Sequence, residues 1–571
     1  MKLGTNGEGC FENLDDFSKS KLKELGDVVM RFPGGPISRF SDPFTTRKGW
    51  GITPESVNYF FDNYEVGAEE DDTGGSIEKW LGKEAVQPEY SYMDSLISLS
   101  QEMPGLSIIF VANVFTSTTE AQFAAIQYLK QGGVRIEAVE FGNEVYGKYD
   151  FNTANYIATC EPIIALIKES YPEIKISLIS GNFKGRRDHD QWNEQLAVYV
   201  NNPVNKIDYV TLHFYIGSDI APEAYSLLPA PKVVDYSTVD VVLADACDAY
   251  VEEVLLQERF QEEIDMAKSL YNTGIIITEW NNNPAASWCN TLVNSQWLFS
   301  QMIGLEGVDI LCMHNGISPD VYGMICQAKK QDDVLTEMVV RTSYYAIKLA
   351  NEIKTKNVID VYDEINIGAP GEYCIPIIGL DSELTIPILS SCPIESITAR
   401  YITGKYPYSS AGSIGCQSKD QPKNYEIAGV TDYIQNVDSG EITIPSNSFG
   451  YFLIKAVEVN KAPVADAGND RVVYLVNGTA STTLSATNSF DEDGNIISYY
   501  WSSNTMAIAD TAITTVSFST PGKYVYTVIV VDDKGLSDSD SVTITVKNKK
   551  KRFWDGWFGK SKATKNETSK N

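Results

Sequence analysis

Two glutamates stand at the ends of apolar runs, where a surface charge would not normally fall. Glu144 follows the segment VEFGN, and Glu279 follows the segment GIIIT. Paired carboxyl groups about 5–5.5 Å apart can cleave a glycosidic bond, one as acid and base and the other as nucleophile. If both segments are strands of one barrel, the two carboxylates share its mouth. We therefore predict Glu144 as the general acid/base and Glu279 as the nucleophile.

The two glutamates need different charge states, and nearby polar residues can set them. We expect the second carboxylate to keep Glu144 protonated, ready to protonate the leaving oxygen. Arg31 follows another apolar run. If it points into the same pocket, its charge favours the ionised form of Glu279. The alternative is that Arg31 only pairs with an acid at the barrel rim. Tyr215 is expected to donate a hydrogen bond to Glu279.

Four further side chains are candidates for contact with a sugar. Asn143 can bind the 2-OH, a contact that strengthens in the transition state. His213 and His314 are expected to line the sugar subsite, and Trp280 is expected to stack on a sugar face. Each type also has an ordinary structural use, since Asn143 could form a turn and His213 could be a hydrogen-bonded core histidine.

Strands and helices must alternate over residues 1–357 to position these groups. Continuous Val/Ile/Leu runs predict parallel strands covered on both faces, at 2–6, 27–32, 106–114, 135–142, 173–180, 207–215, 274–280 and 308–315. Amphipathic stretches predict helices between them, at 91–102, 119–131, 153–170, 190–200, 249–271, 292–304 and 336–354. Eight strands with helices predict an α/β fold, a (β/α)8 TIM barrel. A doubly wound open sheet is the alternative, although no GxGxxG follows a strand.

The segment 36–90 is long, acidic and rich in aromatic residues. Structureless loops of this length are usually functional, so we expect it to wall one side of the cleft. The alternative is an inserted subdomain without substrate contact.

Two β-rich regions follow the predicted barrel. Residues 358–457 contain short alternating strands separated by Gly, Pro, Ser and Asn, which predicts an antiparallel β-sandwich. Residues 459–547 resemble a PKD domain, a small immunoglobulin-like β-sandwich, and the resemblance makes Trp501 its core tryptophan. It rests on Pro463-Val-Ala-Asp-Ala-Gly468, Asp491-Glu-Asp-Gly494, Ile496-Ile-Ser-Tyr-Tyr-Trp501, Pro521-Gly-Lys-Tyr-Val-Tyr-Thr-Val and Val530-Val-Asp-Asp-Lys-Gly535.

Two features of this C-terminal part have open interpretations. Asp491, Asp493 and Asp532 could bind a structural Ca²⁺ through oxygen ligands, or they could form turns. Residues 548–571 are basic, with a short aromatic island. They are either a disordered tail or an anchor to an anionic surface.

Four motifs in the barrel region together resemble clan A glycoside hydrolases. They occur in the order Arg31-Phe-Pro-Gly-Gly35, Gly142-Asn-Glu144, His213-Phe-Tyr215 and Glu279-Trp280. Within that clan they are most similar to the α-L-arabinofuranosidases of family 51 and to family 39-like enzymes. The resemblance implies a retaining hydrolase that needs no cofactor and no catalytic metal. Pro36 replaces the Asn of family 51, and no sandwich strand precedes the first barrel strand, so an agarase-like substrate stays open.

Composition limits the partners. The chain has 571 residues and a net charge of −30, which repels phosphate backbones and argues against nucleic acid. No apolar window reaches a transmembrane length, and no leader peptide is visible. We expect a secreted or cell-surface protein that acts on a polysaccharide or oligosaccharide, with anchoring through the basic tail as an option. The competing hypothesis is a non-catalytic carbohydrate-binding or virion/adhesin protein on a degenerate barrel.

Overall fold

The structure is a computed structural model, and it forms two compact units, Met1–Val457 and Glu458–Asn571. It describes residues 1–7, 10–12, 14–64, 77–146, 151–183, 187–217, 219–227, 239–282, 291–318, 323–329, 335–359, 361, 363–404, 427–435, 440–504 and 506–549. None of the helices in these segments is long and apolar enough to cross a membrane.

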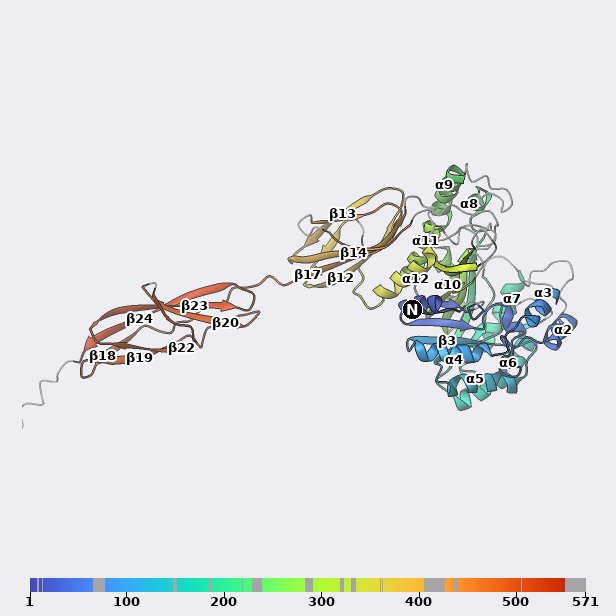
Figure 1. Ribbon diagram of the computed structural model, residues 1–571, viewed down its shortest axis with the longest axis horizontal. Helices are drawn as coiled ribbons and strands as arrows, with labels where there is room; N and C mark the ends of the chain where they lie inside the picture. The colour runs from blue at the N-terminus through green and yellow to red at the C-terminus, as the bar shows by residue number, and fades with distance from the viewer. Residues whose placement is uncertain are drawn as a thin grey trace, which may run out of the picture. The chain divides into compact units, whose positions relative to one another are not determined.

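The first unit is built on a closed barrel of parallel strands, in the order β1 to β8 (Figure 1). The strands are β1 (Lys2–Asn6), β2 (Val28–Phe32), β3 (Leu106–Ala112), β4 (Ile136–Phe141), β5 (Lys175–Ile179), β6 (Tyr209–Ile216), β7 (Gly274–Asn282) and β8 (Ile310–Met313). β1 pairs with both β2 and β8, which closes the sheet and excludes the doubly wound alternative. The predicted (β/α)8 fold and all eight strands are therefore confirmed, because continuous apolar runs suit strands buried on both faces.

Helices cover the outside of the barrel. Figure 1 shows α4 to α6 on the outer side of the strands. Side-chain caps fix several of their starts, since Thr118, Asn152 and Thr291 each accept a hydrogen bond from a backbone N–H of the first turn. The principal covering helices are α1 (Asp16–Glu24), α4 (Tyr92–Glu102), α5 (Thr119–Gln131), α6 (Thr153–Ser170), α7 (Arg187–Val200), α10 (Arg259–Leu270), α11 (Leu292–Gly304) and α12 (Thr342–Ile353).

The segment between β2 and β3 is not the structureless loop that its sequence predicts. It contains the 3₁₀ turn Pro36–Arg39 and the helices α2 (Pro54–Asn63) and α3 (Ile77–Ala85). Its aromatic side chains pack inward, with ring centroids of Phe40 and Trp80 4.7 Å apart. These rings are buried core rather than an open wall, because apolar area is stabilised by removal from water. Residues 65–76 lie outside the described residues, and the contact of this layer with substrate stays a prediction.

Two predicted helices are interrupted. The stretch 249–271 divides into a π-helical turn (Val251–Leu255) and α10, and α8 (Pro222–Leu227) and α9 (Val239–Tyr250) precede them. The stretch 336–354 begins as a strand, because β10 (Leu335–Val340) pairs antiparallel with β9 (Ile325–Lys329) before α12 starts. The β-branched pair Val339-Val340 favours this strand, and amphipathic periodicity alone does not reveal it.

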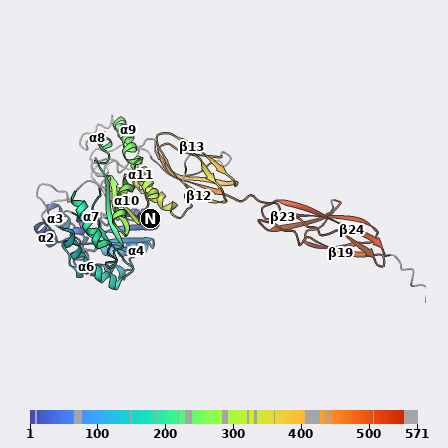
Figure 2. The same ribbon diagram turned by 180° about the vertical axis from the view of Figure 1, so that it is seen from behind.

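The predicted β-sandwich packs against α11 and α12 in the same unit. Its strands are β11 (Ile365–Ile367), β12 (Gly371–Gly379), β13 (Leu384–Ser390), β14 (Ile394–Gly404), β15 (Ile427–Gln435), β16 (Glu441–Ile444) and β17 (Ser448–Ala456). They form sheets in the orders β11-β13-β16 and β12-β17-β14-β15. In both views β12 lies beside α11 (Figure 1, Figure 2). At this seam the Nε2 of Gln296 donates to the carbonyl oxygens of Gly379 and Ser448, at 2.7 and 3.1 Å.

The second unit is a separate β-sandwich with its own core. Its strands are β18 (Arg471–Leu475), β19 (Ala480–Ser485), β20 (Ile496–Ser503), β21 (Met506–Ala509), β22 (Ile513–Phe518), β23 (Gly522–Asp532) and β24 (Ser537–Asn548). They form a sheet in the order β18-β24-β23-β20-β21 and a pair β19-β22. Trp501 on β20 is fully buried between them, as predicted for the core tryptophan.

Candidate active site

The carboxyl ends of the barrel strands bring the predicted polar residues to one rim. Parallel strands of a barrel end on the same face, so residues far apart in sequence meet there. β1, β2, β6, β7 and β8 contribute residues at or just beyond their ends, and the turn after β4 contributes two more. The cluster comprises Asn6, Arg31, Asn143, Glu144, His213, Tyr215, Glu279 and His314.

Glu144 and Glu279 share one pocket, and His213 lies between them. The His213 Nδ1 is 3.2 Å from an oxygen of Glu144 and 3.8 Å from an oxygen of Glu279. One ligand atom from each of the three residues lies within 4.8 Å of the other two. The two carboxylates therefore approach one another closely, although they stand far apart in the sequence.

Glu279 is held on both oxygens. Arg31 Nη1 forms an ion pair with Oε1, which also accepts a 3.1 Å hydrogen bond from Asn6 Nδ2. Tyr215 donates to Oε2 at 2.8 Å. Burial alone would raise the pKa of Glu279, but the charges of His213 and Arg31 bring it well below its usual value. The site thus favours an ionised Glu279.

Arg31 is a buried cation between two carboxylates. Its Nε and Nη2 bind Glu140, with a 3.0 Å contact from Nε, and its Nη2 also donates to Asn143 Oδ1 at 2.8 Å. Burial would lower the pKa of Arg31, but Glu140 and Glu279 together raise it above its usual value. Both interpretations of Arg31 from the sequence apply, because it pairs with a structural acid and also contacts the predicted nucleophile.

The turn after β4 places Glu144 in an unusual backbone conformation. Gly142 has φ of 84° and Glu144 has φ of 47°, both in the left-handed region. A Cβ on Gly142 would lie 2.7 Å from Val145 Cγ1 and 2.9 Å from Val114 Cγ2, so only glycine fits. A glutamate in this region costs conformational energy, and such residues cluster at functional sites.

The two histidines border the same pocket from different strands. His213 is nearly buried, and its Nε2 lies 3.2 Å from Thr278 Oγ1 while its Nδ1 faces the carboxylates. His314 Nδ1 lies 2.9 Å from Asn6 Nδ2, and its ring centroid is 6.0 Å from that of Tyr215. His213 is hydrogen-bonded like a core histidine, yet it also touches Glu144.

Trp280 does not lie where a sugar could stack on it. Side chains alternate along a strand, so Trp280 points to the opposite side of β7 from Glu279. Its ring is fully buried against the helices, with centroids 5.6 Å from Phe260 and 5.3 Å from Trp297. The expectation that Trp280 contacts substrate is therefore wrong, and its role is in the core between strand and helices.

Three polar residues of the site were not predicted. Asn6 bridges Glu279 and His314, Glu140 anchors Arg31, and Thr278 contacts His213. Glu140 carried a signal, since it is an acid within an apolar strand four residues before Glu144. Asn6 also ends its strand, at the position where barrel enzymes place functional groups.

Glu144, His213 and Glu279 are also the one group of three potential metal ligands found among the described residues. An ion there would compete with Arg31 for Glu279, since the guanidinium already pairs with that carboxylate.

The aspartates of the second unit serve turns. Asp532 accepts hydrogen bonds from the backbone N–H of Lys534 and Leu536, at 3.0 and 2.8 Å. Asp493 pairs with Lys534 Nζ at 3.2 Å. Asp491 Oδ2 is buried and has no hydrogen-bond partner among the described residues. Ca²⁺ binding by these three residues stays a prediction, and the turn interpretation accounts for Asp532.

Comparison with known proteins identifies the second unit. Residues 467–546 match a family model for the PKD domain of KIAA0319-like proteins. The chain is 38% identical over 101 residues to the pre-pro-metalloprotease PrtV of Vibrio cholerae, covering 18% of this chain and 10% of PrtV. It is 35% identical over 96 residues to the mouse Dyslexia-associated protein KIAA0319-like protein, covering 16% and 9%. The chain thus spans about a tenth of the curated relatives it matches.

Among solved structures, this one is similar to AbfB, a family 51 α-L-arabinofuranosidase from Bifidobacterium longum. The TM-score is 0.44 at 13% identity, covering 80% of this chain and 95% of that one. Any function for the barrel must therefore be argued from its own residues. The chain combines a (β/α)8 barrel and a β-sandwich with a C-terminal PKD domain.

Proposed function

We propose that this protein is a retaining glycoside hydrolase with Glu279 as nucleophile and Glu144 as general acid/base. The observation that carries the proposal is the pair of carboxylates within 4.8 Å, one of them held in its ionised form by Arg31, Tyr215 and Asn6. A close pair leaves no space for a water between the acid and the sugar, so it suits a covalent intermediate rather than inversion.

The reaction would proceed in two displacements. Glu279 attacks the anomeric carbon while Glu144 gives its proton to the leaving oxygen, which forms a glycosyl ester and releases the alcohol. Glu144, now ionised, takes a proton from water as that water attacks the same carbon. Glu279 leaves as a carboxylate, and the product keeps the configuration of the substrate.

The neighbouring residues support these steps. Arg31 holds the Oδ1 of Asn143, and no described residue accepts from the Nδ2, which is therefore available for a sugar hydroxyl. Tyr215 fixes one oxygen of Glu279 so that the carboxylate keeps one orientation. Preorganised donors of this kind stabilise charge that develops in the transition state.

The test uses charge-neutral variants. Glu144→Gln and Glu279→Gln should each lower kcat by about 10²–10⁴-fold or more on a polysaccharide substrate. Glu120→Gln, an exposed residue on α5, is the matched control and should keep full activity. NMR of the first anomer released should show retention. Full activity in either site variant, or an inverted product, contradicts the proposal.

The substrate is proposed from the sequence motifs alone. An aryl α-L-arabinofuranoside and agarose are the first two compounds to compare, because the barrel motifs resemble family 51 and depart from it at Pro36. Such substrates place the enzyme outside the cell or at its surface. Glycan binding without release of reducing sugar would instead favour the non-catalytic carbohydrate-binding alternative.

A further inference from the structure

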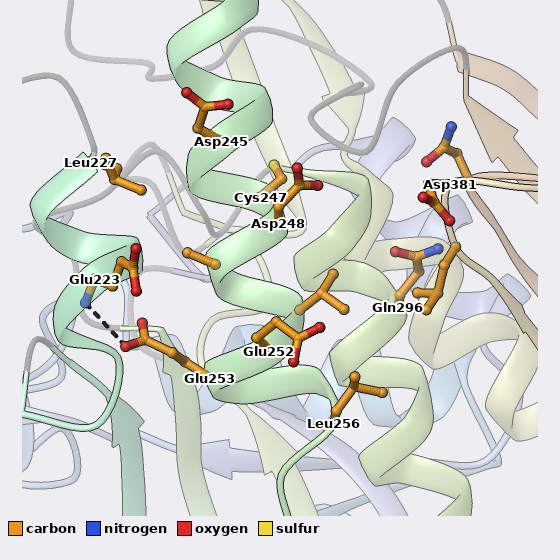
Figure 3. Close-up of a pocket in the computed structure, with 14 residues that line it drawn as sticks. Glu223, Leu227, Asp245, Cys247, Asp248, Glu252, Glu253, Leu256, Gln296 and Asp381 are labelled. Atoms are coloured by element: carbon orange, nitrogen blue, oxygen red, sulfur yellow. Dashed lines mark hydrogen bonds between the residues drawn. The ribbon is translucent and has the colours of Figure 1, made fainter.

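A second cavity, of about 720 Å³, lies on the helical side of the first unit, away from the residues of the barrel mouth. Helices α8, α9 and α11, the π-helical turn and two loops of the β-sandwich line it (Figure 3). Six lining residues are acidic, and none is Lys, Arg or His. The acids are Glu223, Asp245, Asp248, Glu252, Glu253 and Asp381.

Most of this negative charge is not compensated by the described residues. Glu253 accepts two backbone hydrogen bonds at the start of α8, from Glu223 and Ala224. Asp245, Asp248, Glu252 and Asp381 form no ion pair or side-chain hydrogen bond with any residue that the structure describes. Burial, Asp245 and Asp381 raise the pKa of Asp248, in that order of size. Like charges in a partly desolvated space disfavour ionisation.

Two nearly buried amides also face this cavity. Gln296 is 1% exposed, and its Nε2 is fully used by Gly379 and Ser448. Its Oε1 has no hydrogen-bond partner among the described residues, and Figure 3 shows the amide oxygen turned toward the helices that carry Asp248 and Glu252. Asn447 is 8% exposed, and its side chain has no hydrogen bond with described residues. Buried amides are normally hydrogen-bonded, so these point to a missing partner.

The chemistry of the lining selects the kind of ligand. Carboxylates and the Gln296 oxygen accept hydrogen bonds, so a matching ligand must donate them and carry positive charge. A bare metal ion fits poorly, because no three acids of this cavity bring ligand atoms together as Glu144, His213 and Glu279 do in the described chain. The volume is that of an organic ligand site. Leu227, Leu256 and Leu380 supply apolar contact between the charged groups.

We propose that this cavity binds a linear aliphatic polyamine. Its ammonium groups bind Asp248 and Asp381 at one end and Glu252 at the other, with Gln296 Oε1 as a further acceptor. Its methylene groups pack on the leucines. Because the ligand touches both α9 and the sandwich residue Asp381, binding ties the sandwich to the barrel helices. The site is independent of the proposed hydrolase activity.

The experiment measures spermidine binding to the full chain by calorimetry and by thermal unfolding at constant ionic strength. The test variant is Asp248→Asn/Glu252→Gln, and the control variant Glu120→Gln/Glu169→Gln removes the same charge from exposed positions on α5 and α6. We expect saturable binding that raises Tm, an affinity at least about tenfold weaker in the test variant, and an affinity in the control variant like that of the unchanged chain. Calcium chloride is the second probe.

Each outcome decides the proposal. Saturable spermidine binding that is weakened only in the test variant supports it. Absence of saturable binding overturns it, as does an equal loss in both variants, which would indicate general charge attraction. Calcium binding with the same dependence on Asp248 and Glu252, without spermidine binding, also overturns it in favour of a metal site. Glu279→Gln should bind spermidine like the unchanged chain, so failure of one proposal does not affect the other.

Discussion

The barrel mouth and the acidic cavity both collect carboxylates, but only one supplies them with a cation. At the mouth, the buried guanidinium of Arg31 pairs with Glu140 and Glu279. In the cavity, Asp245, Asp248 and Asp381 face one another without a basic side chain in the lining. The pKa of Glu279 is consequently lowered and that of Asp248 is raised. The same kind of group is thus prepared for chemistry in one place and for a positively charged ligand in the other.

Removal of the cation at the mouth should have the largest effect. Arg31→Met leaves the carboxylates of Glu140 and Glu279 buried without their partner, and breaking such a pair costs about 3–5 kcal/mol. Urea unfolding should show this loss, and Arg31→Lys should fall between Arg31→Met and the unchanged chain. Arg135→Met is the control, since its ion pair with Glu137 is exposed and worth less than about 1 kcal/mol. Equal losses at both positions would show that burial gives the Arg31 pairs no special weight.

The pH dependence of Glu279 gives an intermediate effect. A carboxyl group whose folded pKa is depressed contributes stability above its unfolded pKa of about 4.3, and that contribution is lost as the pH falls. The free energy of unfolding of the unchanged chain should therefore exceed that of Glu279→Gln most clearly above roughly pH 5. The difference should shrink toward acid pH. A difference that grows on acidification would show that Glu279 is not held ionised.

Asp248 should behave in the opposite sense, with the smallest effect. Its folded pKa is raised, so the unchanged chain loses stability relative to Asp248→Asn as the pH rises through that pKa. Thermal unfolding should show Asp248→Asn with a slightly higher Tm at neutral pH and no gain at acid pH. Saturating spermidine should cancel the gain. A lower Tm for Asp248→Asn at neutral pH would mean that the cavity already neutralises this charge.

The sequence predicted the features that repeat locally. Barrel strands such as 106–114 are continuous apolar runs, and Glu144 and Glu279 interrupt such runs, so both could be located without coordinates. The partners of these glutamates could not, because Asn6 and Glu140 act through contacts that span 273 and 109 residues. Trp280 was misassigned because its place after Glu279 suggested the site, whereas strand alternation turns it away.

The helices around the acidic cavity were harder to predict. The break between the π-helical turn and α10 falls inside one amphipathic pattern, and periodicity does not report where a helix ends. The cavity itself joins residues of α9 to Asp381 of the sandwich, so no local pattern reveals it.

The seam at Gln296 bears on how the protein can be divided for experiments. A shortened chain that stops at residue 357, where the sequence suggests a boundary, would strip Gln296 of both carbonyl acceptors and uncover Phe299, whose ring lies 5.6 Å from that of Phe449. Exposed apolar surface of this kind promotes aggregation. The smallest fragment worth expressing for barrel biochemistry therefore ends at Val457.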